Sequence, residues 1–412
     1  MNWLDLASRN LLRNAGRSVT TMAAVTLGYA AVNIFGGFAA YMFLSIRDAY
    51  IHNQTNGHVQ LWKEGYKDHG GSNPSQYLIP PELQQRVQDF AAKDPRVVLA
   101  AGTLEISGSI DVDGVPTFFI GQSMKPSDRE RIDSASSQSD HKPGYEGDRI
   151  TDETPEGIGI TEGMARNLHL EKGSGVLLMA PTIENQMNAV DATVFQVIDM
   201  PAEALNNRFL YLPLALAQKL YETGGVTTMR LLLKDLKDSE AVVADLKKEL
   251  DGEGLDILTW DQASPLYHRT KSMFDIIFGM VFCIIITIVS MSVLNTIGMA
   301  VIERTREIGT LRALGLKRPG VIGLFALESG LLGFIGATLG LIITVGFSMM
   351  IASIEPKWEP PMIARAVVWE IRLVPAYLLG SFVVLVLLTF AAAILPARRA
   401  ACAGIVDSLG HS

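Results

Sequence analysis

The chain has 412 residues, of which 48% are hydrophobic, and a formal net charge of −8 at pH 7. An excess of negative charge does not attract a nucleic acid, so the composition gives no indication of a nucleic-acid partner. Its two cysteines, Cys283 and Cys402, lie outside the long polar stretch at 47–272, so that stretch has no disulfide and must be stabilised by its own hydrophobic core.

Four long segments carry no charged residue, namely 18–46, 276–302, 329–354 and 373–397, with lengths of 29, 27, 26 and 25 residues. A hydrocarbon core roughly 30 Å thick needs about 20 apolar residues of helix, so each segment is long enough to cross it. We predict transmembrane helices over 18–46, 273–302, 319–354 and 373–397. The alternative for the first segment is a cleaved signal peptide, whose apolar region is typically only about 7–15 residues long.

The residues before the first span have a helical pattern. One face of a helix over residues 3–12 would carry Trp3, Leu4, Ala7, Leu11 and Leu12. This pattern is typical of a helix that lies in the membrane interface, and it also fits an ordinary cytoplasmic lead-in. We therefore assign 1–17 to a cytoplasmic or interfacial helix.

The insert between the first two spans, 47–272, reads as mixed α/β. Strands are predicted at 57–62 and 98–120, with a hairpin tip at Gly114, and a helix is predicted to begin at Pro80. The second half gives strand, helix and strand at 157–181, then apolar segments at 193–200 and 208–221. A strand and an amphipathic helix that begins near Asp238 follow over 227–250.

These elements predict two α/β lobes and a helical stalk that runs from about Asp261 into the second span. The polar stretch 125–156 is predicted to be a long surface loop or an insertion. The fold class expected is thus a membrane protein of four transmembrane helices, with a large mixed α/β extracytoplasmic domain inserted between helices 1 and 2.

Basic residues predict the orientation of the chain. The segments 1–17, 303–318 and 397–412 together hold ten Lys and Arg against four acids, whereas 47–272 holds 22 basic and 34 acidic residues. Short loops rich in Lys and Arg stay in the cytoplasm, and long domains are translocated largely regardless of their charge. We expect 47–272 and the loop 355–372 to be periplasmic, and both termini, including the tail 398–412, to be cytoplasmic.

Motifs for chemistry are absent from the sequence. It contains no G-x-x-x-x-G-K-S/T, H-E-x-x-H, G-x-S-x-G or C-x-x-C. The seven histidines lack metal-ligand spacing, and His52 and His58 are predicted to be two surface residues. We therefore expect a non-catalytic chain without a cofactor or metal of its own.

The segment 301–320, VIERTREIGTLRALGLKRPG, predicts a short amphipathic helix on the cytoplasmic side. Ile308, Leu311 and Leu314 form an apolar stripe between charged edges, and Gly315 with the following Pro-Gly ends the helix. A solvated loop would explain the arginines but not the periodic apolar face. The face therefore indicates a docking surface for another protein.

Two features of the third span need partners. Glu328 is the single acid there, and a charged group at mid-span costs about 2.5–3.5 kcal/mol on insertion scales, so we expect it near the interface beside a Ser or Arg, or in a working role. A stripe of small residues allows close helix approach within the bundle or at a dimer seam. It consists of Gly330, Gly333, Gly336 and Gly340.

The runs ERTREIGTLRALG, FALESGLLGFIGATLG and LPARRAACAGIVDSL resemble the permease domain of FtsX/MacB-type ABC transporters. ITEGMARNLHLEKGSGVLL and LYLPLALAQKLY are similar to the external domains of MacB and of the lipoprotein-releasing permeases LolC and LolE. The resemblance covers nearly the whole chain except 125–156. NGHVQLW after the first span, and the lack of a fused ATPase, favour the lipoprotein-releasing type in layout.

The resemblance implies a dimeric inner-membrane machine in which a separate ATPase dimer binds ATP and Mg and pushes on the cytoplasmic helix of each permease. That motion would reach the periplasmic domain by mechanotransmission. By position, the ATPase-coupling residues would be Glu303, Arg304, Arg306, Glu307, Gly309, Arg312 and Gly315. The implied partners are the ATPase, a second permease that is the same chain or a paralogue, and membrane lipid.

The resemblance also implies a cargo, either lipoprotein or another amphipathic molecule, held near the outer leaflet. The candidate groove residues are Phe38, Tyr41, Met42, Phe43, Met273, Phe274, Ile277 and Phe278. Ordinary anchoring at the interface explains the same residue types. Two further alternatives are an FtsX-like signalling subunit that controls a periplasmic enzyme, and MacB-like efflux with a periplasmic adaptor.

Overall fold

The computed structural model describes residues 15–70, 74–112, 114–136, 144–199, 205–358 and 367–402. The predicted interfacial helix at 3–12 and most of the predicted tail lie outside these residues. The chain divides into two compact units. One contains Met1–Phe43, Thr270–Pro356 and Val368–Ser412, and the other contains Leu44–Arg269 and Lys357–Val367.

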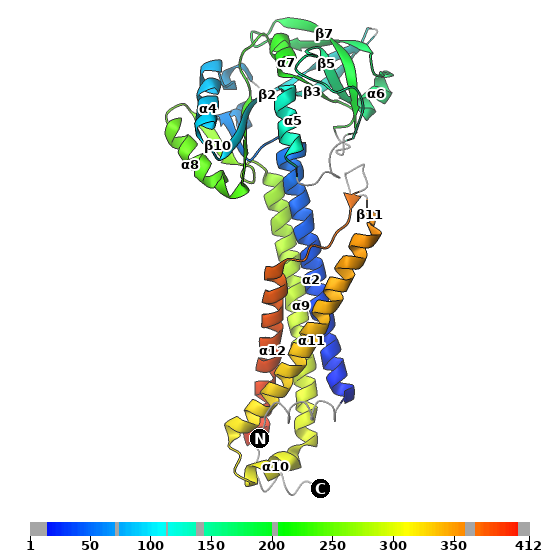
Figure 1. Cartoon of the computed structure of the whole chain (residues 1–412), viewed down its shortest axis with the longest axis vertical. Coiled ribbons are helices and arrows are strands. Elements are labelled where there is room, and N and C mark those ends of the chain that lie inside the picture. Colours follow the sequence, from blue (N-terminus) through cyan, green and yellow to red (C-terminus); the bar gives the residue numbers. More distant parts are fainter. Residues whose placement is uncertain are drawn as a thin grey trace. The chain divides into compact units, whose positions relative to one another are not determined.

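Four helices in the described part of the chain are long and apolar enough to cross a membrane. They are α2 (Ala15–Asp48), α9 (Pro265–Glu303), α11 (Arg318–Ile354) and α12 (Pro375–Cys402). The α/β elements lie between α2 and α9 in the sequence, as Figure 1 shows by colour, so the predicted fold class is confirmed. The helix expected from Asp261 begins at Pro265, because Thr259 donates a hydrogen bond to Asp261 (2.5 Å) and holds the preceding residues in a turn.

The glycine stripe of α11 packs against two helices of the same chain. A Cβ added at Gly336 would lie 2.9 Å from Cβ of Val25, and one at Gly340 would lie 2.8 Å from the carbonyl oxygen of Thr26, both on α2. The Thr26 hydroxyl donates a hydrogen bond to the Gly336 carbonyl at 3.0 Å. The other two glycines, Gly330 and Gly333, lie against α12 at Phe390 and Thr389. The sequence left two locations open for the glycine stripe, within the bundle or at a dimer seam. These contacts place it within the bundle.

The second unit contains a sheet of ten strands in the order β10-β1-β9-β2-β3-β8-β5-β7-β4, with β6 paired to β2 and β7. The strands are β1 (Val59–Lys63), β2 (Val97–Val112), β3 (Val115–Met124), β4 (Tyr145–Gly147), β5 (Gly157–Thr161), β6 (Gly175–Pro181), β7 (Met187–Ile198), β8 (Phe209–Pro213), β9 (Thr228–Leu233) and β10 (Leu255–Thr259). The mixed pairing, with β3–β8 and β5–β7 parallel and the other pairs antiparallel, is that of an α/β domain rather than a simple meander.

This sheet carries two large hydrophobic cores and a smaller third cluster that includes Met124, Ile132 and Tyr211. Helices α4 (Pro81–Lys93) and α8 (Ser239–Glu249) contribute to the core beside β1, β9 and β10, and α6 (Glu162–Leu168) and α7 (Leu214–Tyr221) contribute to the other (Figure 1). The 16-residue strand β2 belongs to both, because it pairs with β9 over 97–103 and with β3 over 103–112. The two large cores therefore share one sheet, and the division into two lobes stays a prediction.

Shorter elements complete the described chain. They are η1 (Ala49–Asn53), α3 (Tyr66–His69), η2 (Pro74–Tyr77), α5 (Pro126–Ser134), η4 (Leu236–Asp238), α10 (Thr305–Ala313), β11 (Lys357–Trp358) and β12 (Val367–Val368). The hairpin expected at Gly114 is present, with a φ of +84° that glycine adopts without strain. The expectation of a loop at 125–156 is wrong at α5, where Pro126 begins a helix whose Ile132 is fully buried.

Replacing Gly340 by valine should lower the free energy of unfolding by about 1–3 kcal/mol, because the new side chain meets backbone of α2 that cannot move aside. Equilibrium unfolding of the full chain in mixed micelles measures this change. Gly346→Val on the same helix is the matched control, since no atom lies within 4 Å of a Cβ added there. Equal stability of the two variants would contradict the close α2–α11 packing.

Candidate functional site

The predicted coupling helix is α10 (Thr305–Ala313), a separate short helix between α9 and α11. Helix α9 ends at Glu303, and the next residue, Arg304, has a non-helical φ of −103° and ψ of 12° before α10 begins. At the other end Gly315 has a φ of +101°, a conformation that favours glycine and ends the helix. Ile308 and Gly309 are buried, so one face of α10 packs on the helices of its own unit.

The remaining predicted coupling residues differ in exposure. Glu303, Glu307 and Gly315 are exposed, and Arg312 is half-buried. The side chains of Arg306 and Leu311 lie outside the described part. Leu314, predicted to belong to the apolar stripe, is 81% exposed, so the apolar residues of this segment divide between an internal contact and the surface.

Arg304 is buried and pairs with the lone acid of the third span. Its Nη1 lies 3.3 Å from Oε2 of Glu328, and the two residues are 5% and 4% exposed. The sequence left a serine or an arginine open as the partner of Glu328, and the structure shows an arginine. Arg304 thus contacts α11 within its own chain, and its role as an ATPase-facing residue stays a prediction.

A charge buried at the edge of an apolar bundle is costly when alone, and removing one partner of such a pair leaves the other uncompensated. The Arg304–Glu328 pair therefore fixes the start of α10 relative to α11. The two residues are 24 positions apart, so the contact ties the start of α10 to α11, in addition to the apolar cluster that contains Ile308 and Val321. A movement of α10 must either carry α11 with it or break this pair.

The candidate groove residues fall into two groups within the helical unit. Phe274 of α9 contacts Phe43 of α2 with ring centroids 5.5 Å apart, and Phe278 stacks on Phe35 at 6.1 Å. Phe38 and Tyr41 instead contact the segment before α12, through the ring of Trp369 and the carbonyl of Val368. Met42 and Ile277 are half-buried, and Met273 is exposed. Aromatic contacts within one chain therefore occupy the α2–α9 surface that was considered for cargo.

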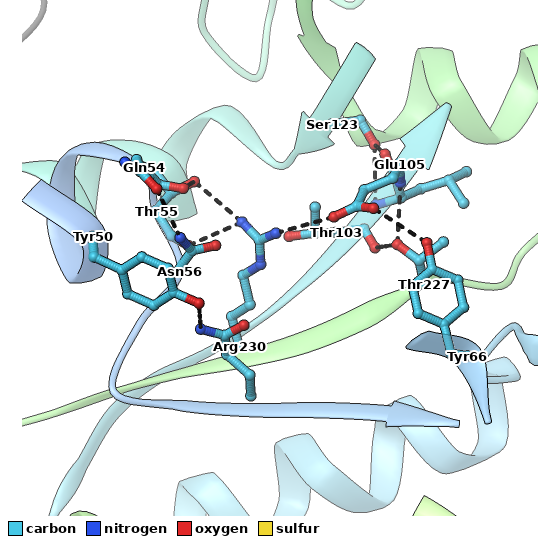
Figure 2. Close-up of polar contacts among 12 residues, drawn as sticks. Tyr50, Gln54, Thr55, Asn56, Tyr66, Thr103, Glu105, Ser123, Thr227 and Arg230 are labelled. Atoms are coloured by element: carbon cyan, nitrogen blue, oxygen red, sulfur yellow. Dashed lines mark hydrogen bonds and ion pairs between the residues drawn. The ribbon is translucent and has the colours of Figure 1, made fainter. Parts of the chain in front are cut away.

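The residues after α2 are anchored to the sheet by a buried arginine that sequence reasoning missed. Figure 2 shows the Arg230 guanidinium of β9 between Thr55 and Glu105. Its Nη1 donates to the Thr55 carbonyl at 3.3 Å, its Nη2 lies 3.6 Å from Oε1 of Glu105, and an amide oxygen of Gln122 oriented toward it accepts from both nitrogens. The Tyr66 hydroxyl donates to the other oxygen of Glu105 at 3.2 Å.

The backbone at this anchor is also constrained. Thr55 has a φ of +55°, which is unusual for a β-branched residue, and Gly57 has a φ of +67°. A Cβ at Gly57 would lie 2.7 Å from the carbonyl oxygen of Leu231 on β9. Burial lowers the pKa of Arg230, and the nearby Glu105 carboxylate opposes that shift. A lone arginine in the apolar run TTMRLLL was the signal in the sequence that could have revealed this group.

The two histidines expected on the surface are buried in this same region. His52 and His58 are 9% and 7% exposed, and their rings lie 5.7 Å apart. The expectation was wrong because His52 of η1 packs against α5, with its Nδ1 3.0 Å from the Ile132 carbonyl, and His58 lies against Leu233 of β9. No group of three or more possible metal ligands occurs among the residues that the structure describes.

Comparison with known proteins identifies the two parts of the chain. Residues 18–249 match the family model of the MacB-like periplasmic core domain, and residues 279–403 match that of the FtsX-like permease C-terminal domain. The helices and the inserted α/β domain thus define an ABC transporter permease. The chain belongs to the MacB/FtsX family of these permeases.

Curated relatives are similar over parts of their length. An uncharacterized ABC transporter permease of Methanocaldococcus jannaschii is 28% identical over 173 residues, covering 42% of each chain. The lipoprotein-releasing protein LolC of Xylella fastidiosa is 27% identical over 45% of this chain and 46% of its own. The macrolide export protein MacB of Bordetella avium is 26% identical over 42% of this chain and 25% of its own. Each match thus spans less than half of the relative's length.

Among solved structures, the periplasmic region of MacB from Actinobacillus actinomycetemcomitans aligns with 52% of this chain and 92% of its own. The TM-score is 0.37 and the sequence identity is 11%.

Replacing Glu328 by glutamine should lower the free energy of unfolding by about 3–5 kcal/mol, because it leaves Arg304 buried without a counter-charge. Replacing both residues with apolar ones, as in Arg304→Met with Glu328→Leu, should be much less costly. A double-mutant cycle of unfolding in mixed micelles, with Arg304→Met, Glu328→Leu and the variant that carries both, measures the coupling of the pair. If the two single changes lower the free energy of unfolding additively, the ion pair does not stabilise α10 on α11.

Proposed function

We propose that this chain is the permease subunit of an ABC transporter in a bacterial inner membrane, and that it relays motion from a separate ATPase to its periplasmic-type domain. The observation that carries the proposal is the buried Arg304–Glu328 pair, which makes α10 a lever attached to α11. The exposed Glu307 and Leu314 supply the contact surface for the ATPase. ATP and Mg bind in that partner, consistent with the lack of a phosphate-binding motif in this sequence.

The contacts within each unit provide a route for such motion. In the helical unit, α11 packs against α2 at Gly336 and Gly340, so displacement of α11 pushes on α2. Chain connectivity then leads from α2 through η1 to Thr55, which Arg230 holds to the sheet. Helices are stiff along their axis, so a push is transmitted along α2 with little loss.

A second permease completes the assembly in this proposal. Helix α9 has a stripe of apolar side chains that are more than half exposed, at Met273, Met280, Ile284, Ile288 and Met291. The spacing of seven, four, four and three residues places them on one face of the helix. That face meets the partner permease, and the remaining apolar surface of the bundle meets lipid.

The proposed topology has both termini and α10 in the cytoplasm and the α/β domain in the periplasm. It rests on the excess of Lys and Arg in the short segments and on the match of 18–249 to a periplasmic core domain. The proposed cargo is lipoprotein or another amphipathic molecule taken from the outer leaflet. The similarity to LolC, a transmembrane protein of a lipoprotein-releasing system, supports it.

Reversing the charge of Arg312 to glutamate should abolish most of the cargo-stimulated ATP turnover of the complex while the chain remains inserted, since Arg312 lies at the edge of the lever. ATPase assays on the reconstituted complex measure this. Lys317→Glu makes the same change in net charge on an exposed residue just outside α10 and should leave turnover unchanged. Normal turnover and normal assembly of the Arg312 variant would show that α10 is not the docking surface.

The cargo is tested by purifying the complex with its ATPase from detergent and identifying what accompanies it. Triacylated lipoprotein is the expected companion. A cell-wall hydrolase would instead indicate an FtsX-like signalling subunit, and a periplasmic adaptor would indicate MacB-like efflux. Either of these would contradict the cargo assignment without affecting the coupling role of α10.

A further inference from the structure

A cavity of about 360 Å³ in the α/β domain lies beside the buried histidines. It is lined by His52, His58, Val98, Arg131, Ser134, Ala135, Leu232, Leu233 and Lys234. Its volume is in the range of small-molecule sites, which is about 300–1,000 Å³. All four titratable side chains that line it are bases, although the stretch 47–272 has an excess of acids. The wall of this cavity is therefore suited to an anion.

His58 has a fixed orientation at this wall. Its Nδ1 accepts a hydrogen bond from the backbone N–H of Leu233 at 3.1 Å, so the ring hydrogen of the neutral form is on Nε2. Burial, followed by electrostatic interaction with His52 and Arg47, lowers the pKa of His58 to about 4, and Asp235 opposes the shift. At neutral pH the ring is therefore neutral, with its N–H donor at Nε2. His58 lines the cavity, so an acceptor bound there can take a hydrogen bond from this donor.

Two exposed cations flank the cavity. Arg131 makes one long hydrogen bond, from Nη2 to the Val98 carbonyl at 3.4 Å, and Lys234 makes no ion pair with a described residue. Two acids close in sequence to the lining residues are already engaged. Asp48 accepts a hydrogen bond from Ser136 (2.5 Å) and lies 4.0 Å from His52, and Asp235 accepts from the backbone of Lys237 (3.0 Å). Asp128 on α5 interacts electrostatically with Arg131 and compensates its charge in part, whereas Lys234 has no ion pair with a described residue.

We propose that this cavity binds a phosphate group, which accepts a hydrogen bond from Nε2 of His58 and pairs with Arg131 and Lys234. Guanidinium and ammonium groups together with a neutral imidazole donor match the several acceptor oxygens of a phosphate. His52 belongs to the last turn of the first candidate span, Ser18–Asn53, and His58 follows that span by five residues. The headgroup of an anionic phospholipid and free phosphate are thus both available sources. Binding here requires neither the ATPase nor the motion proposed above.

Isothermal titration of the full chain in detergent tests the site with two probes, inorganic phosphate and short-chain dihexanoyl phosphatidylglycerol. Dihexanoylglycerol, which lacks the phosphate, is the control for the acyl chains. The variant Arg131→Gln with Lys234→Gln should weaken binding by on the order of tenfold or more, because it removes both charge-assisted contacts. The matched control, Arg208→Gln with Lys237→Gln, removes the same charge from exposed residues outside the cavity and should leave binding unchanged.

His58→Asn separates the hydrogen-bonding role of the imidazole from folding. The asparagine oxygen can still accept from the Leu233 N–H, but the Nε2 donor is lost, so a folded variant should bind the probe more weakly. Binding of inorganic phosphate would show that the phosphate alone is sufficient, and binding of the lipid alone would identify a headgroup site. No binding of either probe, or equal binding by the cavity variant and its matched control, would overturn the site.

Discussion

A helix that crosses hydrocarbon must satisfy its own backbone hydrogen bonds and exclude uncompensated charge, and the architecture of this chain follows from that constraint. Four uncharged segments form α2, α9, α11 and α12, and the polar residues are thereby collected into one α/β domain between the first two. The one acid inside the candidate span α11 is acceptable because Arg304 neutralises it. That exception is also what attaches the short helix α10 to the bundle.

Two arginines are buried in the described part of the chain, and they have different surroundings but the same mechanical effect in the proposed mechanism. Arg304 pairs with an equally buried carboxylate, so the ion pair is shielded from water. Arg230 is paired with Glu105, whose side chain is half-exposed, and it also donates hydrogen bonds to Thr55 and Gln122. Each arginine adds a buried polar contact to a segment that links two larger elements. In the proposed mechanism, motion enters the helical unit at Arg304 and reaches the sheet at Arg230.

The sequence predicted the features that depend on local composition. Uncharged length located the spans, and the glycine of the β2–β3 turn marked a hairpin. Features that depend on pairing between distant residues were not predictable, because nothing in the sequence of α11 indicates that its acid meets Arg304 24 residues earlier. Helix α5 was missed because its polar residues outweighed the one fully buried side chain, Ile132. The burial of His58 depends on a turn that brings it against β9, and spacing alone gave no sign of it.

The proposed mechanism requires α10 and the α/β domain to lie on opposite sides of the membrane, so that a push on one must travel through the helices to reach the other. Single-cysteine labelling in spheroplasts, after Cys283 and Cys402 are replaced by serine, tests this requirement. Met187 and Leu314 are 70% and 81% exposed and belong to the domain and to the turn after α10, so each tolerates cysteine. A membrane-impermeant maleimide should label Met187→Cys in intact spheroplasts and Leu314→Cys only after lysis. Labelling of both from the same side would rule out the mechanism.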